Sequence, residues 1–290
     1  LYTGMSIIDY AQYKGGVPGV ETVEIGGPFD GRVAEDSPAR RQVFVCRPAG
    51  PEDEACARRI LAELARRAYR GHSSGGDVDR LIDFFRMGRT DGGFDGGIGL
   101  AMERILAGPK FLFVTESSPP RAKPGSLFRL PDLELATRLS LFLWSSIPDE
   151  ALLAAAESGA LRDPAVLEQQ VRRMLDDPRS KALVDNFAGQ WLYLRNLNAA
   201  APDGELFPYF DDNLRYAFRR ESELFFEHVL REDRPLLELL DADYTFINER
   251  LAVHYGIPGV YGGHFRKISL SDGKRGGLLG QGSILTVTSY

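Results

Sequence analysis

The sequence has no long apolar runs and no excess of basic residues, and each absence argues against one class of protein. No apolar stretch in the 290 residues approaches the length of about eighteen residues that a membrane-spanning helix needs. The formal net charge of −6 disfavours nucleic acid as a main partner, because surfaces that bind nucleic acid are rich in basic side chains. With 43% hydrophobic and 26% charged residues, the composition is typical of a globular chain that buries a sizeable core.

Motifs that identify a reaction are also absent. The four histidines are spread so widely that no pair has the i, i+4 spacing of a zinc-binding helix, and neither HExxH nor CxxC occurs. A phosphate loop is excluded because Arg275 follows Lys274 where Walker A needs serine or threonine, and GxSxG is missing. Without CxxCH, these residues cannot attach a c-type haem covalently.

Cysteine is scarce, with only Cys46 and Cys56, and a short loop that contains Pro48 and Gly50 separates them. We predict a disulfide between the two, because the second cysteine opens a helix at the point where a crosslink would fix its start. Closing this loop would contribute about 3 kcal/mol through loop entropy. The alternative is two buried free thiols in a cytoplasmic protein, whereas a disulfide implies an oxidising, extracytoplasmic compartment.

Helical periodicity dominates from about Pro51 onward. The predicted fold class is therefore mainly α, a multi-helix bundle with a short β remnant at the N-terminus. The remnant is inferred from GVETVEIGGPFD, and SSPPRAKPGS is interpreted as an internal linker. Neither end has the pattern expected of a natural terminus. The predicted division is a β remnant of an upstream module (1–36), an N-terminal helical subdomain (37–116), a linker (117–126) and a larger helical bundle (127–290).

Several element boundaries follow from local signals. Asp163 and Asp177 precede prolines and are predicted N-caps, and Thr245 is predicted to cap a helix over Phe246–Tyr255. GRTDGGFDGG is predicted to form a turn between two helices, HFRKISL a short strand, and RGGLLGQGSILT a return to helix. Aromatic residues such as Trp191 are interpreted as core.

The predicted long helix, which starts at Asp211 or Asp212 and ends near Leu230, carries polar groups on its apolar face. A 100° projection places Glu221 and His228 within the stripe of Leu214, Phe218 and Phe225. A buried carboxylate needs a partner or a raised pKa, so Glu221 is a candidate catalytic acid, metal ligand or salt-bridge member. We favour a structural pair with an arginine. His228 is a candidate cofactor ligand, although a satisfied core or rim histidine is the commoner case.

The dipeptide His254-Tyr255 lies just before Gly256, where the predicted helix ends. This position offers a metal or haem ligand, so His254 is a candidate catalytic or cofactor-binding residue and Tyr255 a candidate cofactor contact. The alternative is an ordinary histidine at a helix C-terminus, whose protonated form the helix dipole favours.

Five blocks of sequence, taken in order, resemble a known family: CRPAG, CARRILAELARRAYR, FRLPDLELATRLSLFLWSSIPDE, NFAGQWLYLRNL and DYTFINERLAVHYGIPGV. The chain is similar, from about Val20 to Tyr290, to the large secreted proteins of planctomycetes, acidobacteria and myxobacteria that contain cytochrome-c-associated domains of unknown function. In that family a β-rich module precedes the helical region, and a domain with a CxxCH haem site follows it.

The resemblance implies a periplasmic or secreted protein that works beside c-type haem, with the haem in another segment or in a partner. The implied function is the helical core of a haem-associated redox protein that docks a c-type cytochrome domain or subunit. An alternative is a non-catalytic accessory subunit of a larger, membrane-associated assembly. A third is a metal-dependent hydrolase that uses Glu221 and a histidine. The resemblance supplies no catalytic residues, and no nucleic-acid partner is expected.

Overall fold

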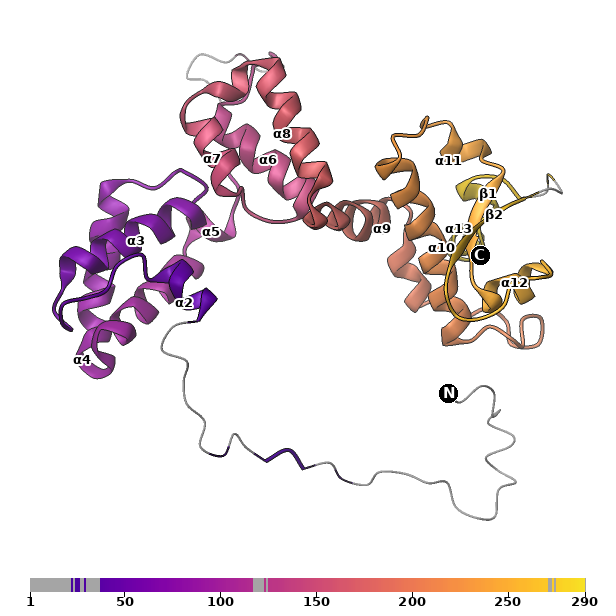
Figure 1. Cartoon of the computed structure of the whole chain (residues 1–290), viewed down its shortest axis with the longest axis horizontal. Coiled ribbons are helices and arrows are strands. Elements are labelled where there is room, and N and C mark those ends of the chain that lie inside the picture. Colours follow the sequence, from indigo (N-terminus) through magenta and orange to yellow (C-terminus); the bar gives the residue numbers. More distant parts are fainter. Residues whose placement is uncertain are drawn as a thin grey trace. The chain divides into compact units, whose positions relative to one another are not determined.

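The computed structural model describes residues 22, 24–26, 29, 37–116, 123, 125–270, 273 and 275–289. The chain divides into two units, Leu1–Val45 and Cys46–Tyr290, which are described separately below. Helices make up most of the described residues, and their strands form one two-stranded sheet, so the predicted mainly α fold class is confirmed (Figure 1). Among these residues, no helix combines the length and the apolar character needed to cross a membrane.

The first unit contributes one described helix, α2 (Pro38–Val43). Its N-cap is Ser37, whose hydroxyl accepts a hydrogen bond from the backbone N–H of Arg40 at 3.1 Å. The predicted β remnant over 1–36 falls almost wholly outside the described residues. That assignment, like the predicted linker over 117–126, therefore stays a prediction.

The second unit begins with a disulfide and the helix that it fixes. Cys46 and Cys56 are bonded, which confirms the predicted pairing. Helix α3 (Glu54–Ala68) starts at this point, and the side chain of its N-cap, Asp53, accepts the backbone N–H of Cys56 at 3.0 Å. The crosslink therefore joins the first turn of α3 to the preceding loop.

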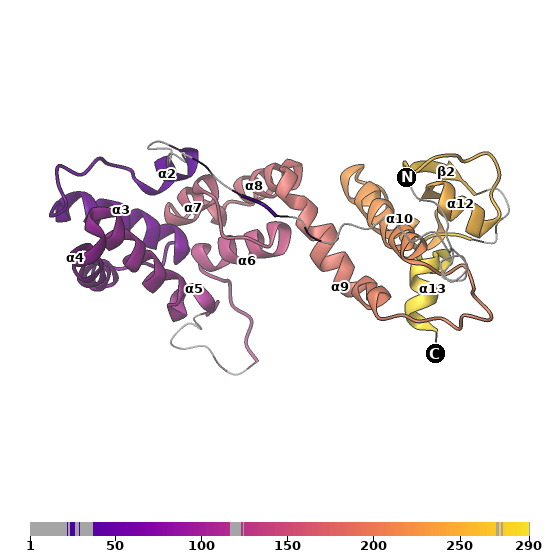
Figure 2. The same cartoon turned by 90° about the horizontal axis from the view of Figure 1, so that it is seen from below.

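Helix α4 (Gly75–Leu106) lies beside α3 (Figures 1 and 2). Ser74 and Asp77 form a capping box at its start, in which each side chain bonds the backbone of the other residue. The helix is broken at Gly93, where φ is +61°, a conformation that favours glycine. This break lies in the predicted GRTDGGFDGG turn. A short helix, α5 (Pro109–Leu112), follows.

Three helices form the next layer: α6 (Asp132–Trp144), α7 (Glu150–Glu157) and α8 (Pro164–Asp176). Asp163 caps α8 as predicted, and its side chain accepts the backbone N–H of Ala165 at 2.9 Å. The buried faces of the three helices share one apolar cluster. Its largest members include Leu143, Trp144, Leu152, Leu161, Met174 and Leu183.

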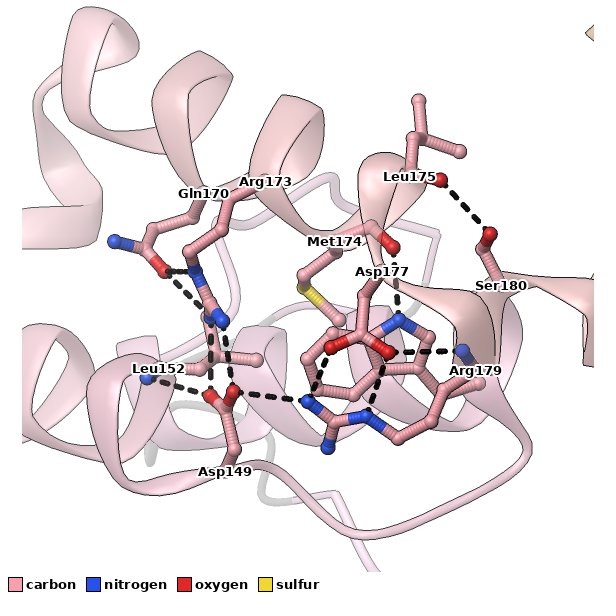
Figure 3. A network of polar contacts seen from close by, with 10 residues as sticks. Asp149, Leu152, Gln170, Arg173, Met174, Leu175, Asp177, Arg179 and Ser180 are labelled. Carbon is pink, nitrogen blue, oxygen red and sulfur yellow. Dashed lines mark hydrogen bonds and ion pairs between the residues drawn. The ribbon is translucent and has the colours of Figure 1, made fainter. Parts of the chain in front are cut away.

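A network of hydrogen bonds between two arginines and two aspartates links the start of α7 to the end of α8 (Figure 3). Arg179 lies over the ring of Trp144 at 3.5 Å and donates hydrogen bonds to Asp177 at 2.7 Å and Asp149 at 3.3 Å. Arg173 donates to Asp149 at 2.7 Å. Burial alone would raise the pKa of Asp149, but the bonds from these arginines bring it below its usual value. Asp177 is the predicted cap, although it opens a single 3₁₀ turn, η2 (Pro178–Ser180).

The chain then changes its helical geometry. A π-helix, η3 (Leu183–Ala188), continues directly into the short α9 (Gly189–Trp191) and then into a 3₁₀ segment, η4 (Leu194–Asn198). A π-helix has more residues per turn than an α-helix, so side chains after it point in directions that a regular 100° projection does not predict.

The last part of the second unit is built around one long helix, α10, which contacts β1, α12 and α13 (Figures 1 and 2). The elements are α10 (Asp212–Arg231), α11 (Glu238–Asp241), β1 (Tyr244–Ile247), α12 (Glu249–Tyr255), β2 (Arg266–Ser269), η5 (Leu278–Gly280) and α13 (Gly282–Thr288). The predicted strand in HFRKISL and the predicted helix in RGGLLGQGSILT are both confirmed.

The predicted helix start at Thr245 is wrong. Thr245 lies in β1, which pairs antiparallel with β2, and Asn248 caps the helix by accepting the backbone N–H of Leu251 at 3.0 Å. The sequence Tyr-Thr-Phe-Ile has the aromatic and β-branched residues that favour strands. Its pairing partner lies about twenty residues further along the chain, so helical periodicity could not reveal it.

Candidate functional site

The main candidate site is the buried carboxyl group of Glu221, on α10. Glu221 is only 1% exposed, and it lies on the same face of α10 as Leu214, Phe218 and Phe225. The projection from sequence therefore placed Glu221 correctly. Burial of a carboxyl among apolar side chains is costly unless hydrogen bonds compensate for the water that it loses.

Two hydroxyl groups supply these hydrogen bonds. Thr245 Oγ1, from β1, donates to Glu221 Oε1 at 2.7 Å. The phenol of Tyr255, at the end of α12, donates to Oε2 at 2.7 Å. The favoured interpretation from sequence, a salt bridge with an arginine, is thus not what the structure contains. Neutral donors satisfy the carboxyl because β1 and α12 bring them to α10 from positions far along the chain.

Tyr255 extends the hydrogen-bonded chain to a fourth element. Its phenol oxygen accepts the backbone N–H of Gly282, at the start of α13, at 2.7 Å. The guanidinium of Arg275 lies over the ring of Tyr255 at 4.1 Å. A path of hydrogen bonds therefore links α10 to the first turn of α13 through Glu221 and Tyr255.

Burial changes the pKa of both Glu221 and Tyr255. Burial raises the pKa of Glu221 to about 7, and the bonds from Thr245 and Tyr255 limit that rise. Burial and the adjacent carboxyl group also raise the pKa of Tyr255 well above its usual value. Glu221 therefore exchanges its proton near neutral pH, while Tyr255 stays a hydrogen-bond donor.

A second set of polar side chains adjoins this carboxyl. Ser222 Oγ donates to Gln281 Oε1 at 2.5 Å and also contacts Ser283 Oγ, and all three residues are buried. The Nε2 atom of Gln281 is buried and has no hydrogen-bond partner among the described residues. Buried polar side chains are normally satisfied, so the burial of this amide nitrogen is an uncompensated cost at the start of α13.

The packing around this set is tight at one glycine. A Cβ added to Gly282 would lie 2.2 Å from the ring of Phe218, a distance that no folded structure tolerates without movement. Glycine is therefore required for α13 to begin against α10. This contact and the hydrogen bonds together fix the start of α13 against α10.

The chemistry open to Glu221 follows from this geometry. A general acid or base needs a pKa near the working pH, which Glu221 has. It also needs access to a reacting group, whereas both oxygens of Glu221 accept hydrogen bonds inside the fold. The arrangement thus favours a positional role over proton transfer to a substrate.

The structure gives His228 and Tyr255 partners within the protein. Nε2 of His228 lies 2.8 Å from the ammonium of Lys267, and the imidazole packs on the rings of Tyr244 and Phe246. Burial and the charge of Lys267 lower the pKa of His228. Both groups are therefore hydrogen-bonded within the fold, and their roles as cofactor contacts stay predictions.

His254 lies near the end of α12, next to Tyr255, and packs against aromatic rings. Its ring packs edge-on against Phe218, with 5.2 Å between centroids, and it adjoins the ring of Tyr255. Burial lowers its pKa, and the charges of Arg250 and Arg275 lower it further. Cationic neighbours disfavour a metal ion at this imidazole. The proposed roles of His254 stay predictions.

A metal centre finds no support in the part of the chain that the structure describes. There, no group of three or more histidine, cysteine or acidic side chains is arranged so that it could hold a metal ion. The hydrolase hypothesis required such a group around Glu221, whose partners are instead hydroxyls.

A polar cavity of about 290 Å³ lies outside the predicted sites. Its lining includes Arg70, His72, Lys110 and Glu134. Burial lowers the pKa of His72, while the nearby carboxylate of Glu134 opposes that change. The side chain of His72 is nevertheless exposed at the mouth of its glycine-flanked turn. Because the cavity combines residues far apart in the sequence, no local spacing signals it.

An aromatic groove of about 450 Å³ is the second feature that the sequence did not reveal. Trp191 was interpreted as core, but the structure leaves it 53% exposed. The reason is the π-helix before it, which changes the direction of later side chains. We define the aromatic groove by its lining residues: Leu141, Phe142, Ser145, Asn186, Phe187, Gln190 and Trp191.

Two family models match the chain. Residues 56–116 match PSD5, a protein of unknown function (DUF1595), and residues 130–257 match PSD4, a protein of unknown function (DUF1592). The second match contains Glu221, His228, His254 and Tyr255. Comparison with curated proteins and with solved structures gives no match. Both descriptions state that the function is unknown, so the chemistry must be argued from the chain itself.

Proposed function

We propose that this chain is the helical core of an extracytoplasmic, haem-associated redox protein that docks a c-type cytochrome module. The haem belongs to another segment or to a partner, because these residues contain no CxxCH that could attach it covalently. The haem would supply the electron-transfer chemistry. The described residues would hold the module in place.

The observation that carries the proposal is the Cys46–Cys56 disulfide. Structural disulfides persist in oxidising compartments, which agrees with the periplasmic or secreted location that the sequence resemblance implies. The crosslink fixes the start of α3, at the first residue of the PSD5 match. It therefore supports export of the region that the family models match.

A leucine surface supports the docking role. We define it by four exposed side chains, Leu236, Leu237, Leu240 and Leu279, which lie on or beside the adjoining elements α11 and η5. Exposed apolar groups that gather in this way mark interaction surfaces more often than free surface. A partner module with an apolar patch of its own would be a suitable occupant of such a surface.

The direct experiment is purification of the protein from its native source, followed by an optical spectrum. The proposal predicts a Soret band from haem that co-purifies with the chain. Replacement of Leu236 and Leu237 by aspartate should lower the co-purified haem at least about tenfold. The matched control is Leu206→Asp, which adds charge at an exposed leucine outside that surface and should leave the haem content unchanged. A preparation with no Soret band and no haem in any partner would remove the proposal.

One observation favours a second candidate, a non-catalytic accessory subunit of a larger assembly. Glu221 has a pKa near 7 but is enclosed, with both oxygens bonded inside the fold. Such a carboxyl fits a role in holding elements together. Isolation of the chain as a stable monomer with activity of its own would count against this candidate.

A further inference from the structure

The aromatic groove exposes rings that a folded chain would normally bury. Trp191 is 53% exposed, and Phe142 and Phe187 are 52% and 41% exposed. Burial of rings of this size contributes strongly to folding, so their joint exposure around one hollow is unusual. The π-helix η3 and α9, which carry Phe187 and Trp191, place them there, and π-helical segments are frequent at functional sites.

Neighbouring rings hold the groove in a fixed shape. Phe187 and Trp191 are nearly parallel, with an interplanar angle of 21° and 5.9 Å between centroids. Phe142 meets Phe187 edge-on at 5.5 Å, and Phe226 of α10 contacts both Phe187 and Trp191 at 6.4 Å. A ligand therefore meets rings that are already oriented, which lowers the entropic cost of binding.

The polar side chains that line the groove are all uncharged. The amide of Asn186 donates to Ser145 Oγ at 2.8 Å and accepts from Arg195 at 3.0 Å, so its orientation is fixed. Gln190 is exposed on the next turn. Amide and hydroxyl groups both donate and accept hydrogen bonds, which suits a ligand rich in hydroxyl groups.

We propose that the aromatic groove binds a pyranose ring of a neutral oligosaccharide. The C–H face of such a ring packs on the negative face of an aromatic side chain, while its hydroxyls reach the amides or stay in water. Ring planes with uncharged amides at their edges meet both needs. A planar apolar ligand would instead need a closed pocket, because small-molecule sites bury most of such a ligand.

The test is a titration of the whole chain with cellohexaose, xylohexaose, mannohexaose and chitohexaose, followed by tryptophan fluorescence and calorimetry. The sequence has two tryptophans, and Trp144 is buried, so a change in quenching by acrylamide reports mainly on Trp191. At least one hexasaccharide should protect Trp191 with a dissociation constant between about 10 μM and 1 mM. Trp191→Ala should weaken that binding at least about tenfold.

Two further variants separate stacking from folding. Trp191→Phe keeps a ring and should retain part of the affinity, whereas Tyr261→Ala removes an exposed ring outside the groove and should retain all of it. Circular dichroism and thermal unfolding check that each variant is folded. Three results would overturn the proposal: no protection of Trp191 by any of the four sugars at about 10 mM, binding that Trp191→Ala leaves unchanged, or protection of Trp191 by a c-type cytochrome and not by the sugars.

Discussion

At the scale of single residues, Glu221 shows how environment changes an ordinary side chain. Its two hydroxyl partners, Thr245 and Tyr255, are neutral, so they lower the cost of burial without neutralising a charge. The result is a carboxyl whose pKa is raised to about 7. Any arginine in place of the hydroxyls would have kept the pKa low.

This raised pKa predicts how stability depends on pH. Between the ordinary pKa of 4.5 and the folded value of about 7, the folded chain binds a proton that the unfolded chain has released. Stability from this group is therefore full below about pH 4.5 and is lost as the pH rises through 7. The expected loss is about 3 kcal/mol across that range. Glu221→Gln, which does not titrate, should lack this loss.

The measurement is the free energy of unfolding by urea at several values between pH 5 and pH 8, for both proteins. The pKa values of His72, His228 and His254 are lowered, so these histidines favour stability at higher pH and oppose the effect of Glu221. The histidines are the same in both proteins, so the difference between the two pH dependences of the unfolding free energy gives the contribution of the Glu221 carboxyl. Parallel curves for the two proteins would show that Glu221 keeps its ordinary pKa.

At the scale of elements, the start of α13 depends on a close approach to α10. Gly282→Ala would place a methyl group 2.2 Å from the buried ring of Phe218, so the ring or the start of α13 would have to shift within a packed core. We predict a loss of about 2 kcal/mol or more in the free energy of unfolding, from overpacking. The control is Gly99→Ala in α4, where no atom lies within 4 Å of the added Cβ. That change should stabilise the protein by about 0.5–1 kcal/mol. Equal effects would contradict the packing argument.

The disulfide acts at the same scale, because it fixes the start of α3. Replacement of Cys46 and Cys56 by serine should lower the free energy of unfolding by about 3 kcal/mol. Reduction of the wild-type protein with dithiothreitol should lower the thermal midpoint by a similar amount as the double variant. A reductant that shifts the midpoint of the serine variant as well would indicate that its effect lies elsewhere.

Local signals explain which elements could be predicted. Asp163 and Asp177 cap the turn that directly follows each of them, so the local sequence predicts their role. Glu221 lies on a regular α-helix, where a 100° projection predicts which face a residue occupies. Projection fails at Trp191, which follows a π-helix, and at Thr245, whose strand pairs with residues far along the chain. The hydroxyl partners of Glu221 could not be predicted for the same reason, because they come from other elements.

At the scale of the whole chain, arginine–carboxylate pairs join the segments that the two family models match. Arg66 of α3 donates to Glu150 and Glu157 of α7, each at 2.8 Å, and these bonds raise its pKa further. Paired, bidentate contacts of this kind are stronger than isolated surface ion pairs. The disulfide and this pairing both lie within the second unit. In the function proposed above, this unit docks the cytochrome module.

The measurement that tests this account most directly is the haem content of the natively purified particle, determined as the pyridine haemochrome and divided by the amount of the chain. We predict c-type haem in a constant ratio to the chain, lost when Leu236 and Leu237 are replaced by aspartate and kept in Leu206→Asp. A particle that contains the chain with its disulfide intact, and no haem in any subunit, would contradict it.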